Sequence, residues 1–144
     1  MTTVNRSALV PFTAEQMYDL VDDIDRYPEF LPWCRSTTVL SREPDQVRAT
    51  IEIAHKGFNK AFTTQNRMQH NKMIEMRLVE GPFKHLEGFW RFDSLGNEGC
   101  KVSLDMEFEF AGKLLSMTLG PLFNQIAGSL VDAFTHRAQQ LYGQ

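Results

Sequence analysis

The side chains best suited to catalysis in this 144-residue chain are two cysteines and four histidines. Cys34 and Cys100 form no C-x-x-C pair, so the sequence predicts neither a zinc ribbon nor a redox motif. The histidines lack the spacing of metal ligands; they are His55, His70, His85 and His136. Cys34 would act as a nucleophile only beside a base, and no P-loop, nucleophile-elbow or paired-carboxylate motif is present. We therefore expect a protein that is not an enzyme and that has no catalytic residue, no metal site and no required cofactor.

A short apolar segment, Tyr27–Cys34, points to packing or to non-covalent binding. Its sequence is Tyr-Pro-Glu-Phe-Leu-Pro-Trp-Cys, and the two prolines allow at most a short turn. Burying Phe30, Leu31 and Trp33 would stabilise the fold by about 1.5–3 kcal/mol each, which favours a plug that closes one end of a sheet. The alternative is the rim of a ligand pocket or a contact surface for a partner.

The elements around this segment follow from capping and periodicity. A strand over Thr3–Val10 is expected to end at Pro11. Thr13 and Gln16 have capping-box spacing and predict a helix that extends to Ile24.

Beyond the segment, apolar and polar residues alternate over about six runs, which predicts half-buried antiparallel strands. The clearest run is residues 101–110. Two readings of the inner face are open, an ordinary core or the lining of a cavity. The side chains expected on this face are Met68, Met76, Trp90, Phe92, Leu104, Met106 and Phe108.

After Gly112 the apolar period becomes helical and continues to Tyr142. Gly120-Pro121 is expected to kink or break this helix. The run 114–131 is uncharged but contains Gly-Pro and polar residues, so we predict a buried or lid-like helix and no transmembrane span. The apolar stripe comprises Leu115, Leu119, Leu122, Ile126, Leu130 and Phe134, widened by Met117, Phe123 and Val131.

The charge distribution excludes a general affinity for nucleic acid. The chain has 15 basic and 18 acidic residues, a net charge of -3. Residues 1–72 hold nine of each sign and the remainder holds six basic and nine acidic residues, so neither half is a basic arm. The N-terminus lacks the apolar core of a signal peptide, and a cytoplasmic protein is expected.

Two motifs and the order of the elements carry a resemblance to a known family. Tyr27–Cys34 and Gly81–Phe92 (Gly-Pro-Phe-Lys-His-Leu-Glu-Gly-Phe-Trp-Arg-Phe) are similar to the two signatures of the coenzyme Q-binding protein and ribosome association toxin family, part of the START-like, polyketide cyclase superfamily. The resemblance covers essentially the whole chain. It implies one α+β domain over residues 1–144, with a helix-grip fold in which a curved antiparallel sheet wraps around a long C-terminal helix.

The resemblance implies two functions of different classes. Our first hypothesis is a non-enzymatic protein that holds a hydrophobic molecule, such as ubiquinone or another polyprenyl lipid, and supports respiration. The alternative is a toxin of a type II toxin–antitoxin system, which binds the large ribosomal subunit, blocks subunit association and has a small antitoxin as partner. A peripheral contact with the inner face of the membrane is a further expectation.

In the first hypothesis the ligand lies between the sheet and the C-terminal helix. Thr64, Asn66 and His70 are candidate donors to a quinone head, although exposed strand positions explain them equally well. Phe83, in the Gly81–Phe83 turn, is either a packing staple or a gate. The proposed ligand-binding residues are Phe30, Leu31, Trp33, Met68, Met76, Phe83, Trp90, Phe92, Leu104, Met106, Phe108, Leu122, Phe123, Ile126 and Leu130.

Overall fold

The computed structural model describes residues 1–55 and 58–143, which form one seven-stranded antiparallel sheet and its helices. The strand order is β1-β7-β6-β5-β4-β3-β2, and the predicted α+β architecture is confirmed. The elements are β1 (Thr2–Val10), α1 (Ala14–Asp22), the 3-10 helix η1 (Ile24–Glu29), β2 (Cys34–Glu43), β3 (Gln46–His55), β4 (Phe58–Gln69), β5 (Met73–Glu80), β6 (Phe83–Ser94), β7 (Cys100–Phe110) and α2 (Lys113–Tyr142).

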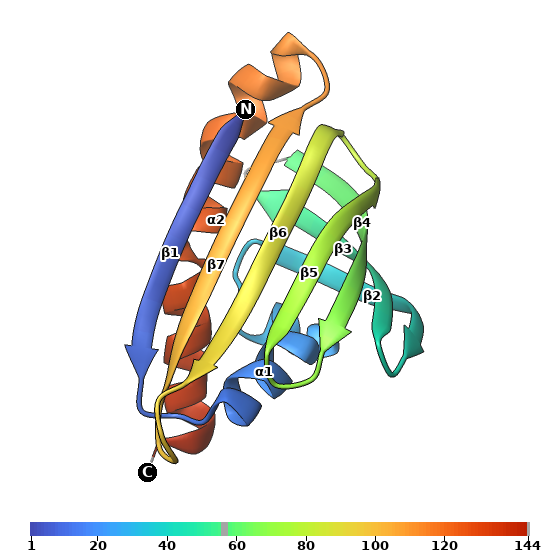
Figure 1. Cartoon of the computed structure of the whole chain (residues 1–144). Coiled ribbons are helices and arrows are strands. Elements are labelled where there is room, and N and C mark those ends of the chain that lie inside the picture. The colour runs from blue at the N-terminus through green and yellow to red at the C-terminus, as the bar shows by residue number, and fades with distance from the viewer. Residues whose placement is uncertain (56–57, 144) are drawn as a thin grey trace.

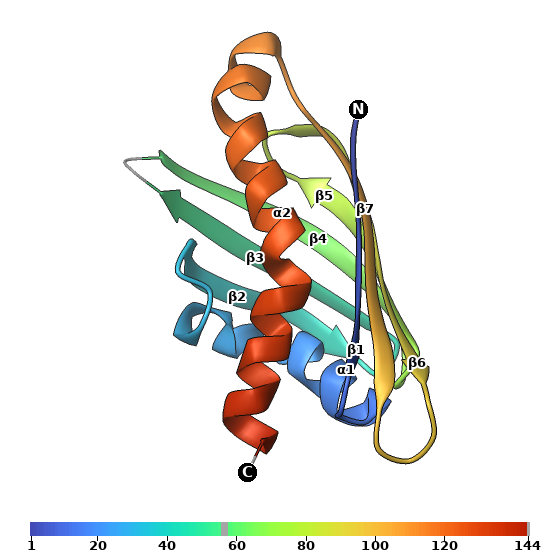
Figure 2. The same cartoon turned by 90° about the vertical axis from the view of Figure 1, so that its left-hand side faces the viewer.

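The sheet curves around α2, which crosses its concave face (Figures 1 and 2). Strands β1 and β2 are the two edges, so α1 and η1 must carry the chain from one edge to the other. Register shifts between β2 and β3, between β4 and β5 and between β6 and β7 mark β-bulges, which bend the strands and favour this curvature. The connection through α1 and η1 therefore lies at one end of the space between sheet and helix.

Helix α1 begins as predicted and ends earlier than predicted. The Thr13 hydroxyl accepts a hydrogen bond from the Gln16 backbone N–H (3.1 Å), and the Gln16 side chain accepts one from the Thr13 N–H (2.9 Å). The helix stops at Asp22 instead of Ile24, because the following residues tighten into η1, which contains Pro28. The buried Tyr27 hydroxyl donates to the Val21 carbonyl and so satisfies one of the last free acceptors of α1.

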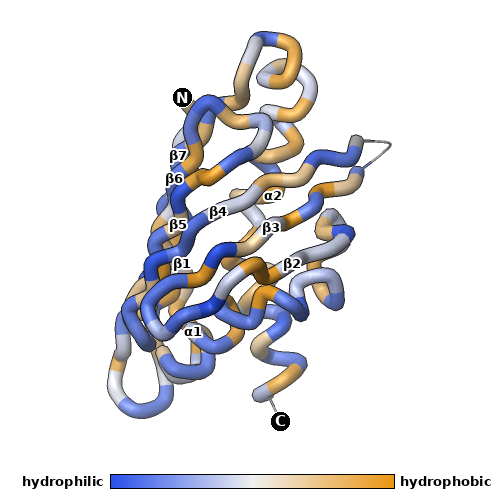
Figure 3. The backbone as a smooth tube through the Cα atoms, turned by 90° about the vertical axis from the view of Figure 1, so that its right-hand side faces the viewer, coloured by the Kyte–Doolittle hydropathy of each residue, from blue (hydrophilic) through white to orange (hydrophobic). Residues whose placement is uncertain are grey.

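The predicted alternation of apolar and polar residues corresponds to the inner and outer faces of the sheet. The hydropathy colours along the strands in Figure 3 illustrate it. In β7 the five apolar residues from Val102 to Phe110 are all buried. They face α2, whereas the intervening polar residues lie on the outer face. One buried layer therefore separates the sheet from the helix.

Helix α2 continues through Pro121 without a break. Because Pro121 has no backbone N–H, the Met117 carbonyl lacks its helical hydrogen bond. Met117 is 74% exposed, so this carbonyl can contact water instead. The prediction that Met117 widens the buried stripe is wrong, because the first turns of α2 extend past the end of the sheet (Figure 1). The buried residues of α2 are Leu119, Phe123, Ile126, Ala127, Val131, Phe134 and Ala138.

By length and composition α2 could cross a membrane. Core helices of soluble proteins meet the same criterion, and in this fold α2 packs along the sheet. Part of its apolar surface packs on the concave face, whereas Leu114 and Met117 in its first turns are exposed.

Candidate functional site

An apolar cavity of about 60 Å³ lies between the sheet and the middle of α2. Its walls come from η1, from β3 to β7 and from α2, together with Trp33, which precedes β2. Seven of the predicted ligand-binding residues line it: Trp33, Met76, Trp90, Met106, Phe123, Ile126 and Leu130. A smaller space of about 20 Å³ is lined by Phe83 and Leu122, and also by Phe123 and Ile126.

The other predicted residues lie outside both linings, in packed surroundings. Phe30 is half-buried and packs edge-on against Phe134, and Phe92 packs edge-on against Tyr18. Leu31 is 1% exposed, which places it in the core as a plug residue. The remaining three, all buried, are Met68, Leu104 and Phe108.

Sequence reasoning missed part of the lining. Ala49 and Ile51 come from β3, Phe62 from β4, and Leu86 and Gly88 from β6. The alternation in β3 signalled an inward face, but alternation does not say which inward positions adjoin empty space. η1 and α2 supply further lining residues absent from the prediction: Ile24, Tyr27, Ala127 and Phe134.

The cavity has one polar spot, formed by Thr64 and Asn66. Both are buried, at 4% and 5% exposure, and the Thr64 hydroxyl donates to Asn66 Oδ1 at 2.9 Å. His70, the third candidate donor, is exposed and packs edge-on against Tyr18 at 5.2 Å between ring centroids. The structure therefore brings two of the three candidates to the cavity.

The Tyr27–Cys34 segment closes one side of the cavity and is held to α2 by an ion pair. Arg137 of α2 donates to Glu29 at 2.7 Å, and its guanidinium lies 5.1 Å from the centre of the Phe30 ring. Hydrogen bonds from Arg26 and then from Arg137 lower the pKa of Glu29 below its ordinary value. The segment is thus both the plug and part of the pocket wall.

The cysteines have no catalytic features. Burial, with a smaller effect of Glu52, raises the pKa of Cys34 to about 11, so its thiolate is scarce at neutral pH. Its Sγ lies 3.8 Å from the Ser36 carbonyl, and no base contacts it among the hydrogen bonds of residues 1–55 and 58–143. Burial also raises the pKa of Cys100. These surroundings suit packed thiols.

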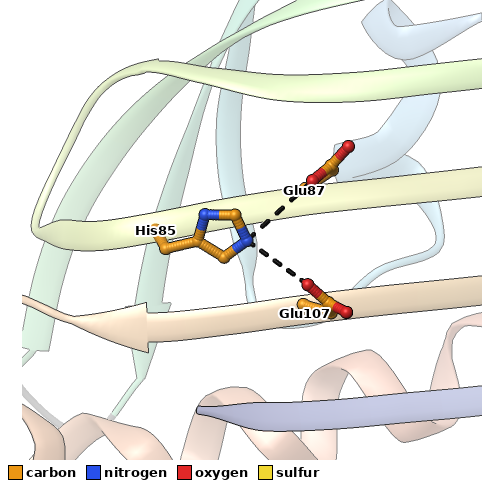
Figure 4. A group of neighbouring side chains, drawn as sticks. All are labelled: His85, Glu87 and Glu107. Atoms are coloured by element: carbon orange, nitrogen blue, oxygen red, sulfur yellow. Dashed lines mark ion pairs between the residues drawn. The ribbon is translucent and has the colours of Figure 1, made fainter.

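One group of described residues has the geometry to hold a metal ion, on the outer face of the sheet. Figure 4 shows His85 and Glu87 of β6 beside Glu107 of β7, with ligand atoms within 4.8 Å of one another. His85 Nε2 lies 3.5 Å from Glu107 and 4.0 Å from Glu87. Spacing along the chain could not reveal the group, since Glu107 comes from another strand. Arg77 also pairs with Glu87, at 3.3 Å.

The comparison with family models identifies the fold family. The model described as "Polyketide cyclase / dehydrase and lipid transport" matches residues 10–135. The chain belongs to this family. Within it, the ribosome association toxin RatA of Pseudomonas aeruginosa is 48% identical over 142 residues, 99% of each chain. The Xenopus laevis mitochondrial coenzyme Q-binding protein COQ10 homolog B is 30% identical over 97% of this chain and 59% of its own length.

Solved structures of the same fold include proteins of different roles. A Thermus thermophilus protein superposes with a TM-score of 0.83 at 20% identity, over 98% of this chain and 99% of its own. The Zhui aromatase/cyclase of Streptomyces superposes with a TM-score of 0.79 at 16% identity, over 96% and 94%. The family model and the RatA relative confirm the family resemblance drawn from Tyr27–Cys34 and Gly81–Phe92, whereas the fold alone is compatible with enzymes and binding proteins.

Proposed function

We propose that this protein binds the ribosome and inhibits the association of its subunits, with the large subunit as its target. The observation that carries the proposal is the 48% identity to a ribosome association toxin over 99% of both chains. The coenzyme Q-binding relative is more distant, at 30% identity. The toxin hypothesis, the alternative in the sequence analysis, is therefore better supported than the quinone hypothesis.

The ribosome proposal predicts where the protein acts and how it makes contact. The site of action is the cytoplasm, and no catalytic step is needed. Because the chain carries a net charge of -3, we expect contact with ribosomal proteins or local basic patches, and only a shallow dependence of affinity on salt. A small antitoxin as regulator is part of the same proposal.

Sucrose-gradient profiling of cells that overproduce the protein tests this function. We expect fewer joined ribosomes, more free subunits, and co-sedimentation of the protein with the large subunit. Purified protein added to separated subunits should also block their joining. An unchanged subunit ratio in both experiments, with no co-sedimentation, would refute the proposal.

A second function, binding of a hydrophobic molecule, is favoured by the apolar cavity under α2. The cavity volume of about 60 Å³ is well below the roughly 300–1,000 Å³ of ligand pockets, so side chains must move to admit a polyprenyl quinone. Solvent extraction and mass spectrometry of protein from its native host would detect a bound lipid. Consistent absence of any lipid, with no binding on titration, would exclude this function.

A further inference from the structure

His85 Nε2, on the outer face of the sheet, is a buried polar atom without a hydrogen-bond partner. Almost none of its surface is open to water, and no group that the structure describes forms a hydrogen bond with it. Two carboxylates face it instead, Glu107 at 3.5 Å and Glu87 at 4.0 Å (Figure 4). A ring nitrogen removed from water without a partner carries a free-energy cost, which coordination of a metal ion would remove.

Strand pairing sets the two carboxylates against each other. In the register of β6 and β7, Glu87 lies directly opposite Glu107. Like charges at facing positions of neighbouring strands destabilise a sheet. The ion pairs of residues 1–55 and 58–143 give Glu107 no lysine or arginine partner. A cation between the two carboxylates would therefore stabilise the pairing of β6 with β7.

Arg77 leaves one oxygen of Glu87 available to such a cation. Its Nη2 approaches Oε1 of Glu87, whereas Oε2 is the oxygen that faces His85 Nε2. Arg77 is itself held by Glu75 at 2.6 Å. Carboxylates that bind metals are commonly oriented by a hydrogen-bond partner of their own. Arg77 is thus a positioning residue for Glu87 and does not block the group.

The donor atoms and their spacing suit a zinc ion. Zinc binds imidazole nitrogen and carboxylate oxygen at about 2.0–2.2 Å in a tetrahedron, which sets the ligand atoms about 3.3–3.6 Å apart. The three ligand atoms lie within 4.8 Å of one another, and the distance of 3.5 Å between His85 and Glu107 already fits. A rotation of the Glu87 side chain closes the longer distances. The imidazole selects against Mg²⁺ and Ca²⁺, which favour sites built from oxygen atoms.

We propose that His85, Glu87 and Glu107 bind a zinc ion on the outer face of the sheet. The ion ties β6 to β7 and neutralises the two facing carboxylates, and its fourth coordination position is left to water. The site lies on the face of the sheet opposite to the cavity. It is therefore independent of both functions proposed above.

Calorimetric titration of the untagged whole protein with zinc chloride tests the site. The protein is first freed of metals with a chelator, and the titration is made at pH 8 because a protonated imidazole cannot bind a metal. We expect one zinc ion per chain and a higher melting temperature, and Co²⁺ should give the visible absorption of a four-coordinate ion. Mg²⁺ should have no effect. Absence of zinc binding, or equal effects of zinc and magnesium, would overturn the proposal.

Glu107→Gln and Glu109→Gln form a matched pair, since each removes one negative charge from β7. Glu109 lies opposite His85 in the register but pairs with Lys84 and with the N-terminal amine. Glu107→Gln should weaken zinc binding by at least about tenfold, as expected for a disturbed metal site. Glu109→Gln should leave the affinity unchanged. Equal zinc affinities of the two variants would overturn the site and assign the binding to general surface charge.

Stability and a second pair of variants complete the test. Without zinc, Glu107→Gln relieves the like-charge pair and should melt above the parent, whereas in saturating zinc it should melt below it. Absence of this reversal would overturn the stabilising role of the ion. His85→Gln should abolish the rise in melting temperature that zinc causes, and His136→Gln, at an exposed position of α2, should retain it. Equal rises in these two variants would overturn the assignment of His85.

Discussion

Two adjoining regions under α2 differ in the volume of empty space they enclose, about 20 Å³ in one and about 60 Å³ in the other. One is an aromatic cluster of Phe62, Phe83, Phe108, Phe110 and Phe123, in which Phe83 stacks on Phe110 at 4.5 Å between ring centroids. The other is the cavity around Asn66, Gly88, Met76 and Met106. Both regions use inward positions of the same strands, and Phe62 and Phe123 belong to both.

The difference lies in the residue types at equivalent positions. The rings of the cluster pack edge-on or stacked and leave only the smaller space of about 20 Å³, which four of them line. Close packing of rings stabilises a fold by dispersion and burial. A glycine, two flexible thioethers and an amide fill the neighbouring space incompletely, and they sacrifice stability for adaptable volume. The cluster therefore packs α2 against the sheet more fully, and the cavity region is where the proposed binding of a hydrophobic molecule would take place.

The largest effect should come from the aromatic cluster. Phe108→Ala removes a fully buried ring that packs edge-on against Phe123 at 4.7 Å. We expect the free energy of unfolding to fall by about 3–5 kcal/mol, measured by urea denaturation. Leu114→Ala, at an exposed position in the first turns of α2, is the control and should change little. A loss below about 1 kcal/mol for Phe108→Ala would mean that the aromatic cluster is not packed more tightly than the cavity region.

A smaller effect is expected in the cavity region. Asn66→Leu alone leaves the buried Thr64 hydroxyl without its acceptor and should cost about 1–3 kcal/mol in unfolding free energy. The double variant Asn66→Leu, Thr64→Val removes both polar partners and should be within about 1 kcal/mol of the parent or more stable. Thermal and urea unfolding of both variants measure this. A double variant less stable than the single one would mean that the polar pair stabilises the fold.

The smallest effect concerns the ion pair that closes the cavity wall. Because Arg26 and Arg137 depress the pKa of Glu29, this carboxylate contributes stability above its ordinary pKa near 4.5, and the contribution disappears as pH falls through the lower folded pKa. Glu29→Gln should therefore lower stability slightly at pH 7 and not at a pH below the folded pKa. Unfolding curves at several pH values test this.

Glu98→Gln supplies the control for that measurement, since Glu98 is exposed and takes part in no ion pair among the described residues. Its stability should match the parent at every pH. A pH-independent loss in Glu29→Gln would show that the effect does not come from the charge of the carboxylate.

Much of the fold could be predicted because its signals are local. The capping box of Thr13 and Gln16, the alternation in β7 and the helical period after Gly112 each depend on neighbouring residues. The end of α1 and the exposure of Met117 were predicted wrongly, since they depend on η1 and on where the sheet stops.

The sequence by itself determined the element order, the apolar faces and the family, because backbone preference and hydrophobic period are properties of short segments. Only the tertiary structure decided which inward residues meet. Strand register places Gly88 between Met76 and Met106, and the curved sheet brings Asn66 under α2. The physical reason is that enclosed volume depends on groups far apart in the chain, so the cavity exists only once the strands are paired and α2 lies across them.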